Sequence, residues 1–294
     1  MGRKKKNEKK KKHEVPRAER EDRHALYQQS VQDPGYETEL ATHYFEQRVG
    51  RRPMSLREDF CGTALLCAEW VKSDPNRTAL GVDIDASVLA WGQEHVFTDL
   101  DEGQRARVST IEGDVRDLHP ERHDVVMALN YSYFCFKSRE ALRGYFATVK
   151  EHLRPDGLLF IDLFGGWESR QAIVEKRKVK GFKYVWDQAS YDPITGDFLA
   201  HIHFHFRDGS KMKEAFTYEW RLWTIPELRE LLAEAGFAHV ECLWEDEDEH
   251  GGGAGTYSPC VSTTNDPAWN AYLMASVQVP PRVAAPGDPG APTG

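Results

Sequence analysis

The sequence predicts an α/β fold, and two observations carry that prediction. Between residues 55 and 163, short apolar segments alternate with helical ones, which is typical of a parallel sheet covered by helices on both faces. Between residues 180 and 223, three alternating runs are joined by turn residues, which predicts an antiparallel β-meander inserted into the main sheet. Ligands of such parallel sheets bind at the carboxyl ends of the strands, so functional residues are expected in the loops that follow them.

The elements are expected in the following order. Residues 17–32 and 36–49 are predicted as polar-rich helices separated by the turn at Asp33, Pro34 and Gly35. Expected strands then cover 56–60, 79–84, 108–111, 124–129 and 158–163, with helices over 63–72, 86–97 and 138–153. A helix over 167–175 precedes meander strands over 182–191, 198–207 and 211–223. The fold is expected to close with a helix over 225–235, a strand over 240–244, a polar loop over 246–255 and a strand over 271–277.

Composition and charge narrow the class of protein further. The chain has 294 residues with 38 basic and 47 acidic side chains, enough for a sizeable core. Residues 1–12 hold eight basic groups against Glu8, so residues 1–16 are predicted to be a disordered basic arm. Nucleic-acid binding by this arm stays open but is not favoured, because no aromatic residue is interleaved with the lysines. The Pro/Gly/Ala-rich residues 279–294 are predicted to be a disordered tail.

The hydropathy and the cysteine pattern of the sequence disfavour a membrane or extracellular protein. No apolar run approaches the roughly 18 residues of a membrane span, and the basic arm lacks the apolar segment of a secretory signal. The five cysteines are scattered and form no CxxC pair, which fits a reducing compartment. We therefore expect a cytoplasmic protein without a membrane partner.

Four strand ends carry residues suited to a nucleotide-like ligand. Residues 58–64 (Glu-Asp-Phe-Cys-Gly-Thr-Ala) close the first strand and open a helix, so a tight turn would present backbone N–H groups. Asp83, 21 residues after Gly62, ends the second strand and could accept hydrogen bonds from ribose hydroxyls. Asp114 follows the third strand, and Asn130 the fourth. Singly, each residue suits a helix cap or turn equally well, but four in chain order favour one cleft.

Over residues 36–277 the chain resembles class I S-adenosylmethionine-dependent methyltransferases. Residues 58–64 match the family's acidic-x-Gly-x-Gly-x-Gly loop, residues 81–83 its ribose-binding acid, residues 113–115 its adenine-contacting segment and residues 153–158 the turn before its fifth strand. Phe60 and Ala64 replace two of the loop glycines and leave Gly62. A dehydrogenase would instead need G-x-G-x-x-G, and that spacing is absent.

The resemblance implies one domain over residues 17–278, built on a Rossmann-like, seven-stranded mixed sheet. Residues 17–50 would form its N-terminal helices and residues 180–223 its inserted β lid. It also implies S-adenosylmethionine as the cofactor, bound by residues in the strand-end loops: Glu58, Phe60, Cys61, Gly62, Thr63, Asp83, Ile84, Asp114, Val115 and Asn130. The helix over 17–32, which carries Arg23, His24, Tyr27 and Gln28, is expected to cover this site.

Candidate catalytic and substrate-binding residues surround the same cleft. Asn130, Tyr131 and Tyr133 would border the reacting methyl group, and either tyrosine or a meander histidine could take a proton from the acceptor. Tyr27, Trp186 and Arg221 are predicted to bind the substrate, although most meander aromatics pack in a core in the plainer interpretation. No metal site is predicted, because same-face histidines on one strand are about 6.5–7 Å apart, too far to share an ion.

The resulting hypothesis is methyl transfer to a small-molecule acceptor at nitrogen or oxygen. One alternative is an RNA methyltransferase that uses the basic arm. Another is a catalytically silent protein that keeps the fold and binds the cofactor. The acceptor and the oligomeric state are left open.

Overall fold

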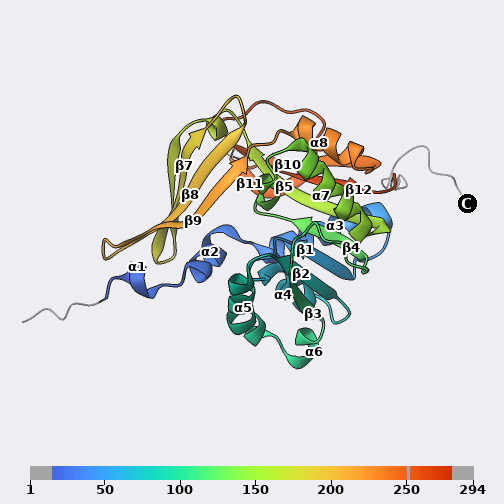
Figure 1. Cartoon of the computed structure of the whole chain (residues 1–294), viewed down its shortest axis with the longest axis horizontal. Helices are drawn as coiled ribbons and strands as arrows, with labels where there is room; N and C mark the ends of the chain where they lie inside the picture. Colours follow the sequence, from blue (N-terminus) through green and yellow to red (C-terminus); the bar gives the residue numbers. More distant parts are fainter. Residues whose placement is uncertain (1–14, 250–251, 280–294) are drawn as a thin grey trace, which may run out of the picture.

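The computed structural model describes residues 15–249 and 252–279, which form two β-sheets with helices around the larger one. The main sheet has the strand order β11-β10-β12-β5-β4-β1-β2-β3, and the smaller sheet, here called the lid, has the order β6-β7-β8-β9. In Figure 1 the lid stands beside the main sheet, with α2 close to its lower edge. The predictions for residues 1–14 and 280–294 lie outside the described residues.

The main sheet is parallel at one side and antiparallel at the other. Its strands are β1 (Ser55–Asp59), β2 (Thr78–Asp83), β3 (Val108–Glu112), β4 (His123–Ala128), β5 (Leu153–Gly165), β10 (His239–Glu247), β11 (Gly253–Pro259) and β12 (Trp269–Ser276). Strands β1 to β5 pair in parallel, and β12, β10 and β11 pair antiparallel. All seven predicted strands are present. An eighth, β11, pairs with β10, and both strands extend into residues 246–255, which were expected to be a loop.

Helices cover both faces of this sheet, and most begin at a side-chain cap. They are α1 (Arg17–Arg20), α2 (Arg23–Val31), α3 (Pro34–Val49), α4 (Leu65–Lys72), α5 (Ala86–His95), α6 (Glu102–Arg105), α7 (Arg139–His152) and α8 (Ile225–Glu234), with 3₁₀ turns η1 (Phe97–Asp99), η2 (Ser132–Cys135) and η3 (Glu168–Arg170). The predicted helix over 17–32 is divided at Asp22, whose carboxylate caps α2 by accepting the N–H groups of His24 and Ala25. Among the helices of the described residues, none is long and apolar enough to span a membrane.

The lid has four strands where the sequence predicted three. They are β6 (Ile173–Val179), β7 (Phe182–Tyr191), β8 (Asp197–Phe206) and β9 (Lys211–Arg221). The helix predicted over 167–175 is wrong: only η3 is helical there, and β6 pairs with β7 from Ile173 onward. A polar segment of this kind takes its conformation from the neighbouring strand, a tertiary influence that local pattern does not reveal.

The two sheets share one part of the core. Phe198 and Trp220 of the lid lie in the same buried cluster as Leu159 and Ile161 of β5. This shared cluster joins the lid to β5 and β12 of the main sheet. A hollow remains between the lid and the strand ends.

Candidate active site

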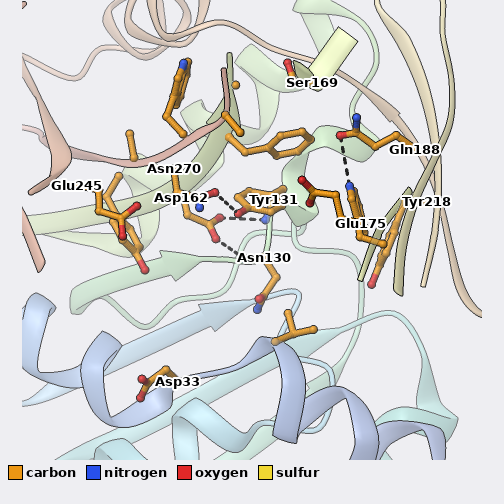
Figure 2. A pocket seen from close by; sticks show the side chains of 18 of the residues that line it. Asp33, Asn130, Tyr131, Asp162, Ser169, Glu175, Gln188, Tyr218, Glu245 and Asn270 are labelled. Atoms are coloured by element: carbon orange, nitrogen blue, oxygen red, sulfur yellow. Dashed lines mark hydrogen bonds between the residues drawn. The ribbon is translucent and has the colours of Figure 1, made fainter. Parts of the chain in front are cut away.

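A cavity of about 540 Å³ lies between the inner face of the lid and the ends of β4, β5 and β12. Figure 2 shows side chains from both sheets and the N-terminal helices pointing into it. Eleven aromatic side chains line it: Tyr27, Tyr36, Tyr131, Phe164, Tyr184, Trp186, Tyr218, Trp220, Tyr257, Trp269 and Tyr272. Six carboxylates line it as well: Asp33, Glu37, Asp162, Glu168, Glu175 and Glu245. Among the described residues, no lysine, arginine or histidine lines the cavity.

At the end of β4, two residues adopt a left-handed backbone conformation. Asn130 has φ 56° and Tyr131 has φ 58°, a conformation that costs a residue with a side chain roughly 1–2 kcal/mol. Asp162 of β5 stabilises both, because its carboxylate accepts the N–H of Asn130 at 2.8 Å and the N–H of Tyr131 at 2.9 Å (Figure 2). Strained backbone of this kind concentrates at functional sites.

Asp162 is a cavity residue that the sequence reasoning missed. Its signal was an acidic residue inside an apolar strand, which suggests a buried partner or a site. Burial raises the pKa of Asp162 from 3.8 to about 7, against the lowering effect of the two backbone hydrogen bonds. Burial also raises the pKa of Glu37 well above its ordinary value, and the negative charges of Asp162 and Glu58 raise it further. Burial at the interior end of the cavity therefore favours the protonated, neutral form of Glu37 and leaves Asp162 close to half ionised near pH 7.

The predicted cofactor loop keeps a glycine-like backbone although two of its glycines are replaced. Phe60 has φ 58° and Ala64 has φ 55°, both in the left-handed region. The Phe60 ring lies 5.9 Å from that of Phe136 and 5.7 Å from that of Tyr145, so aromatic packing helps to offset the strain. The N–H of Gly62 donates to Asp83 at 2.8 Å, which ties the loop to the end of β2.

Several predicted cofactor residues support the loop from below. Glu58 is buried and accepts hydrogen bonds from the backbone N–H of Cys67 at 3.3 Å and its thiol at 3.1 Å. Burial raises the pKa of Glu58 to about 8. Cys61 and Val115 are also buried. These three side chains shape the loop by packing beneath it. Because they are buried, they are not exposed to a ligand.

Other predicted cofactor residues are exposed at the strand ends. Ile84, directly after β2, is 73% exposed, an apolar surface that a planar ligand would cover. Asp114 is partly exposed, and a hydrogen bond from Arg116 lowers the pKa of its carboxyl group. A cluster of three or more histidine, cysteine or acidic residues able to hold a metal does not occur in the described ranges.

Helix α2 lies against this loop, where the sequence predicted a covering helix. The side-chain amide of Gln28 donates to the Thr63 hydroxyl at 2.8 Å. At the start of the helix, the Trp91 indole N–H donates to Asp22 at 2.9 Å. Tyr27 reaches the cavity, so α2 borders both the loop and the acceptor side.

The structure brings only some predicted catalytic and substrate residues to the cavity. Asn130, Tyr131, Tyr27 and Trp186 line it. Tyr133 does not: its side chain is fully buried and its hydroxyl donates to the backbone carbonyl of Asp162 at 2.8 Å.

Arg221 also stays away from the cavity. Its guanidinium lies 3.8 Å from the centre of the Trp223 ring and donates to the carbonyl of Lys137 and to Glu227. These contacts hold Arg221 outside the cavity, so the structure does not bring it to the place where Tyr27 and Trp186 lie.

Residues 60–157 match the sequence family described as "Methyltransferase domain". No curated protein matches the chain. The fold is similar to an S-adenosylmethionine-dependent methyltransferase from Clostridium acetobutylicum, at 14% identity and TM-score 0.63 over 86% of this chain and 97% of that one. It is also similar to CalS10 from Micromonospora echinaspora, an amino pentose methyltransferase with S-adenosylmethionine bound (14%, 0.60, 87% and 96%). A third similar structure is the sugar N-methyltransferase KedS8 from Streptoalloteichus (17%, 0.56, 87% and 92%).

These findings define the class. The fold is that of the class I S-adenosylmethionine-dependent methyltransferases, as the sequence resemblance predicted. Residues 60–157 match the methyltransferase-domain family, and the chain adds a four-stranded lid over an acidic, aromatic cavity.

Proposed function

We propose that the protein transfers the methyl group of S-adenosylmethionine to an amine nitrogen of a small molecule. The observation that carries this proposal is the imbalance of charge in the cavity: six acidic side chains, of which burial favours the neutral form of Glu37, and, among the described residues, no basic side chain. Such a lining attracts a cation and repels carboxylate, phosphate or a nucleic-acid backbone. The aromatic side chains suit an ammonium group or the apolar face of a ring. CalS10, an amino pentose methyltransferase, and KedS8, a sugar N-methyltransferase, are consistent with an amine acceptor.

The strand-end loops fit the cofactor. Ile84 offers an exposed apolar surface that suits the adenine. Asp83 ends β2, where its carboxylate can accept the ribose hydroxyls, and the Gly62 loop precedes α4. When bound, the cofactor supplies an electrophilic methyl group on a sulfonium, and the methyltransferase domain supports its assignment. The chain's own task is to hold the acceptor nitrogen in line with that methyl group and to exclude water.

An ammonium acceptor must lose a proton before its nitrogen can attack. Asp162 has a pKa of about 7 and borders the cavity, so a lone pair not used by the two backbone amides can accept that proton. Tyr131 does not fit this role, because burial raises its pKa well above the ordinary value and its hydroxyl donates to Asn270 at 2.7 Å. Tyr131 instead lines the cavity and positions the acceptor.

Calorimetry with S-adenosylhomocysteine tests the cofactor assignment. We expect binding by the intact protein and a large loss of affinity in Asp83→Ala. Absence of binding, or affinity unchanged by that substitution, would contradict the assignment.

A pair of acceptors tests the amine assignment. Amino sugars and the matching sugars with a hydroxyl in place of the amine are incubated with labelled S-adenosylmethionine, and label is expected in the amines. Glu175, which points into the cavity beside Tyr131 in Figure 2, is changed to Gln. This substitution should lower kcat/KM for the amine about tenfold, because it removes one partly solvated charge contact. The affinity for S-adenosylhomocysteine should not change.

The matched control is Glu219→Gln, an exposed glutamate on β9 that does not line the cavity. Equal effects of the two variants, or label in hydroxyls alone, would contradict the proposal. Cofactor binding with no transfer to any amine would favour the catalytically silent alternative. Label in RNA would favour the RNA alternative.

All five cysteines are unpaired, and they support the proposal that the protein works in a reducing compartment such as the cytoplasm.

A further inference from the structure

The cavity has an acidic side chain on each side of Tyr131. Figure 2 shows Glu175 of β6 on one side of this tyrosine and Glu245 of β10 on the other. In the part of the chain that the structure describes, neither carboxylate forms an ion pair. The cavity therefore offers two separate places where a positively charged group of a ligand would be favoured.

Each of these carboxylates lies directly opposite an aromatic residue on the neighbouring strand. Glu175 pairs with Trp186 of β7, and Glu245 pairs with Tyr257 of β11, both in antiparallel register. Directly opposite residues of antiparallel strands share a face and have Cβ atoms about 4.5–5.5 Å apart. All four side chains line the cavity. A cation at either place would therefore meet a carboxylate and an aromatic ring together.

The two places differ in their exposure to solvent. Glu175 is exposed, whereas Glu245 is half-buried and accepts the N–H of Gly255 at 3.2 Å. Arg177, two residues beyond Glu175 in β6, is engaged elsewhere, because its guanidinium donates to the carbonyl of Ser30. A charge contact is stronger where less water surrounds it, so the place at Glu245 should bind a cation more tightly.

Three tyrosines surround the place at Glu245. The ring of Tyr257 lies 6.0 Å from that of Tyr36 and 4.8 Å from that of Tyr272. Burial, and then the charges of neighbouring groups that include Glu245 and Asp33, raise the pKa of Tyr36 to about 12, so this tyrosine is neutral at pH 7. These five residues all line the cavity and are here called the tyrosine pocket.

Glu37 lies near this pocket and has no partner of its own. It is 8% exposed and lines the cavity, and within the described ranges no residue forms a hydrogen bond with its carboxyl group. Burial and then the charges of Asp162, Glu58 and Asp33 raise its pKa, which places Glu37 near both Asp162 and the tyrosine pocket. Because buried polar groups nearly always have a hydrogen-bond partner, a polar group of the ligand is expected here.

We propose that the acceptor is a diamine, with one nitrogen methylated beside Asp162 and the second held as an ammonium group in the tyrosine pocket. This inference rests on the proposed amine methylation and names the class of amine. The reacting nitrogen forms a bond to the methyl carbon, the electron pair of the broken C–S bond stays on sulfur, and the proton of that nitrogen passes to Asp162. The second ammonium keeps its proton and its contact with Glu245.

The size of the cavity agrees with such an acceptor. Its volume of about 540 Å³ equals that of about 18 water molecules at roughly 30 Å³ each. This space accommodates a ring or chain that carries two amines, and Glu37 can form a hydrogen bond with a polar group between them.

Two measurements on the full chain test the tyrosine pocket. The first is calorimetry of amine binding to protein saturated with S-adenosylhomocysteine, and the second is transfer of label from S-adenosylmethionine. The ligands are straight-chain diamines of increasing length and the amino alcohols that carry a hydroxyl in place of the second amine. At the best length, the diamine should bind about tenfold more tightly than its amino alcohol, because it gains one partly solvated charge contact.

Three variants assign the preference to a side chain. Glu245→Gln keeps an oxygen for the N–H of Gly255 but removes the charge, so it should weaken diamine binding about tenfold and amino alcohol binding less than about twofold. Glu175→Gln should weaken both classes of ligand alike. The control is Glu219→Gln, which removes the same charge at an exposed residue outside the cavity and should leave both affinities unchanged.

Three results would overturn the diamine inference while amine methylation stands. The first is that diamines and amino alcohols bind and react equally well. The second is that Glu245→Gln and Glu219→Gln change diamine affinity by the same factor. The third is that Glu175→Gln removes the preference for diamines and Glu245→Gln keeps it, which would place the second ammonium at the lid. If diamines bind through Glu245 but no amine receives label, the proposed methylation fails and the pocket remains a diamine-binding site.

Discussion

Gly92 of α5 lies directly against the cofactor loop, so a single methyl group there tests the loop's position. A Cβ at residue 92 would lie 2.4 Å from the carbonyl oxygen of Thr63, whereas ordinary contact begins at 3.4 Å. The loop would have to move by about 1 Å, the difference between these two distances. Overpacking of this kind costs about 1–3 kcal/mol, partly offset by the roughly 1 kcal/mol that alanine gains over glycine in a helix.

Gly144→Ala is the matched control. Gly144 is exposed in α7, and no atom lies within 4 Å of the position that its Cβ would take. This variant should therefore gain about 0.5–1 kcal/mol of stability without affecting the loop. The difference between the two variants, about 1–3 kcal/mol, isolates the contact between residue 92 and Thr63.

The assays are urea unfolding and calorimetry with S-adenosylhomocysteine. A misplacement of about 1 Å can cost up to about 100-fold, so Gly92→Ala should bind the ligand far more weakly, while Gly144→Ala should bind it normally. If both variants unfold at the same urea concentration and bind the ligand equally, α5 does not support the loop as described.

Three further predictions concern the same site. Gln28→Ala removes the hydrogen bond to Thr63 and should weaken S-adenosylhomocysteine binding up to about tenfold; unchanged calorimetric affinity would contradict the role of α2 as a cover. Ile84→Ala should change the free energy of unfolding by no more than about 0.5 kcal/mol but weaken S-adenosylhomocysteine binding about five- to tenfold. A loss of stability instead would show that Ile84 packs in the fold. In the unfolded chain the pKa of Asp162 is 3.8, and burial raises it to about 7 in the folded protein. The proton held by folded Asp162 therefore stabilises the fold fully below pH 3.8, and this stabilisation is lost as the pH rises to 7. Between pH 5 and 8 this is roughly 2–3 kcal/mol, and urea unfolding of Asp162→Asn should lack that part of the pH dependence.

The fold class could be predicted because its signals are local. Apolar strands that alternate with helices need only short stretches of sequence to be recognised. The loop after β1 and the acid that ends β2 are each contained within a few residues. For the same reason the prediction failed at residues 167–175, since β6 is a strand only because β7 lies beside it. The replaced glycines left the loop's shape open, and the packing of Phe60 against Phe136 and Tyr145 decides it.

The sequence by itself determined the kind of sheet, the positions of its strand-end loops and the presence of a second, antiparallel sheet. The charge and shape of the cavity were decided by the tertiary structure. Its acidic side chains come from α3 and its N-cap, β5, η3, β6 and β10, among them Glu37, Asp162, Glu175 and Glu245. Each of these residues is an ordinary acidic side chain in its own segment. The physical reason is that an electrostatic field sums over charges close in space, and only folding brings together side chains more than 200 residues apart in the chain.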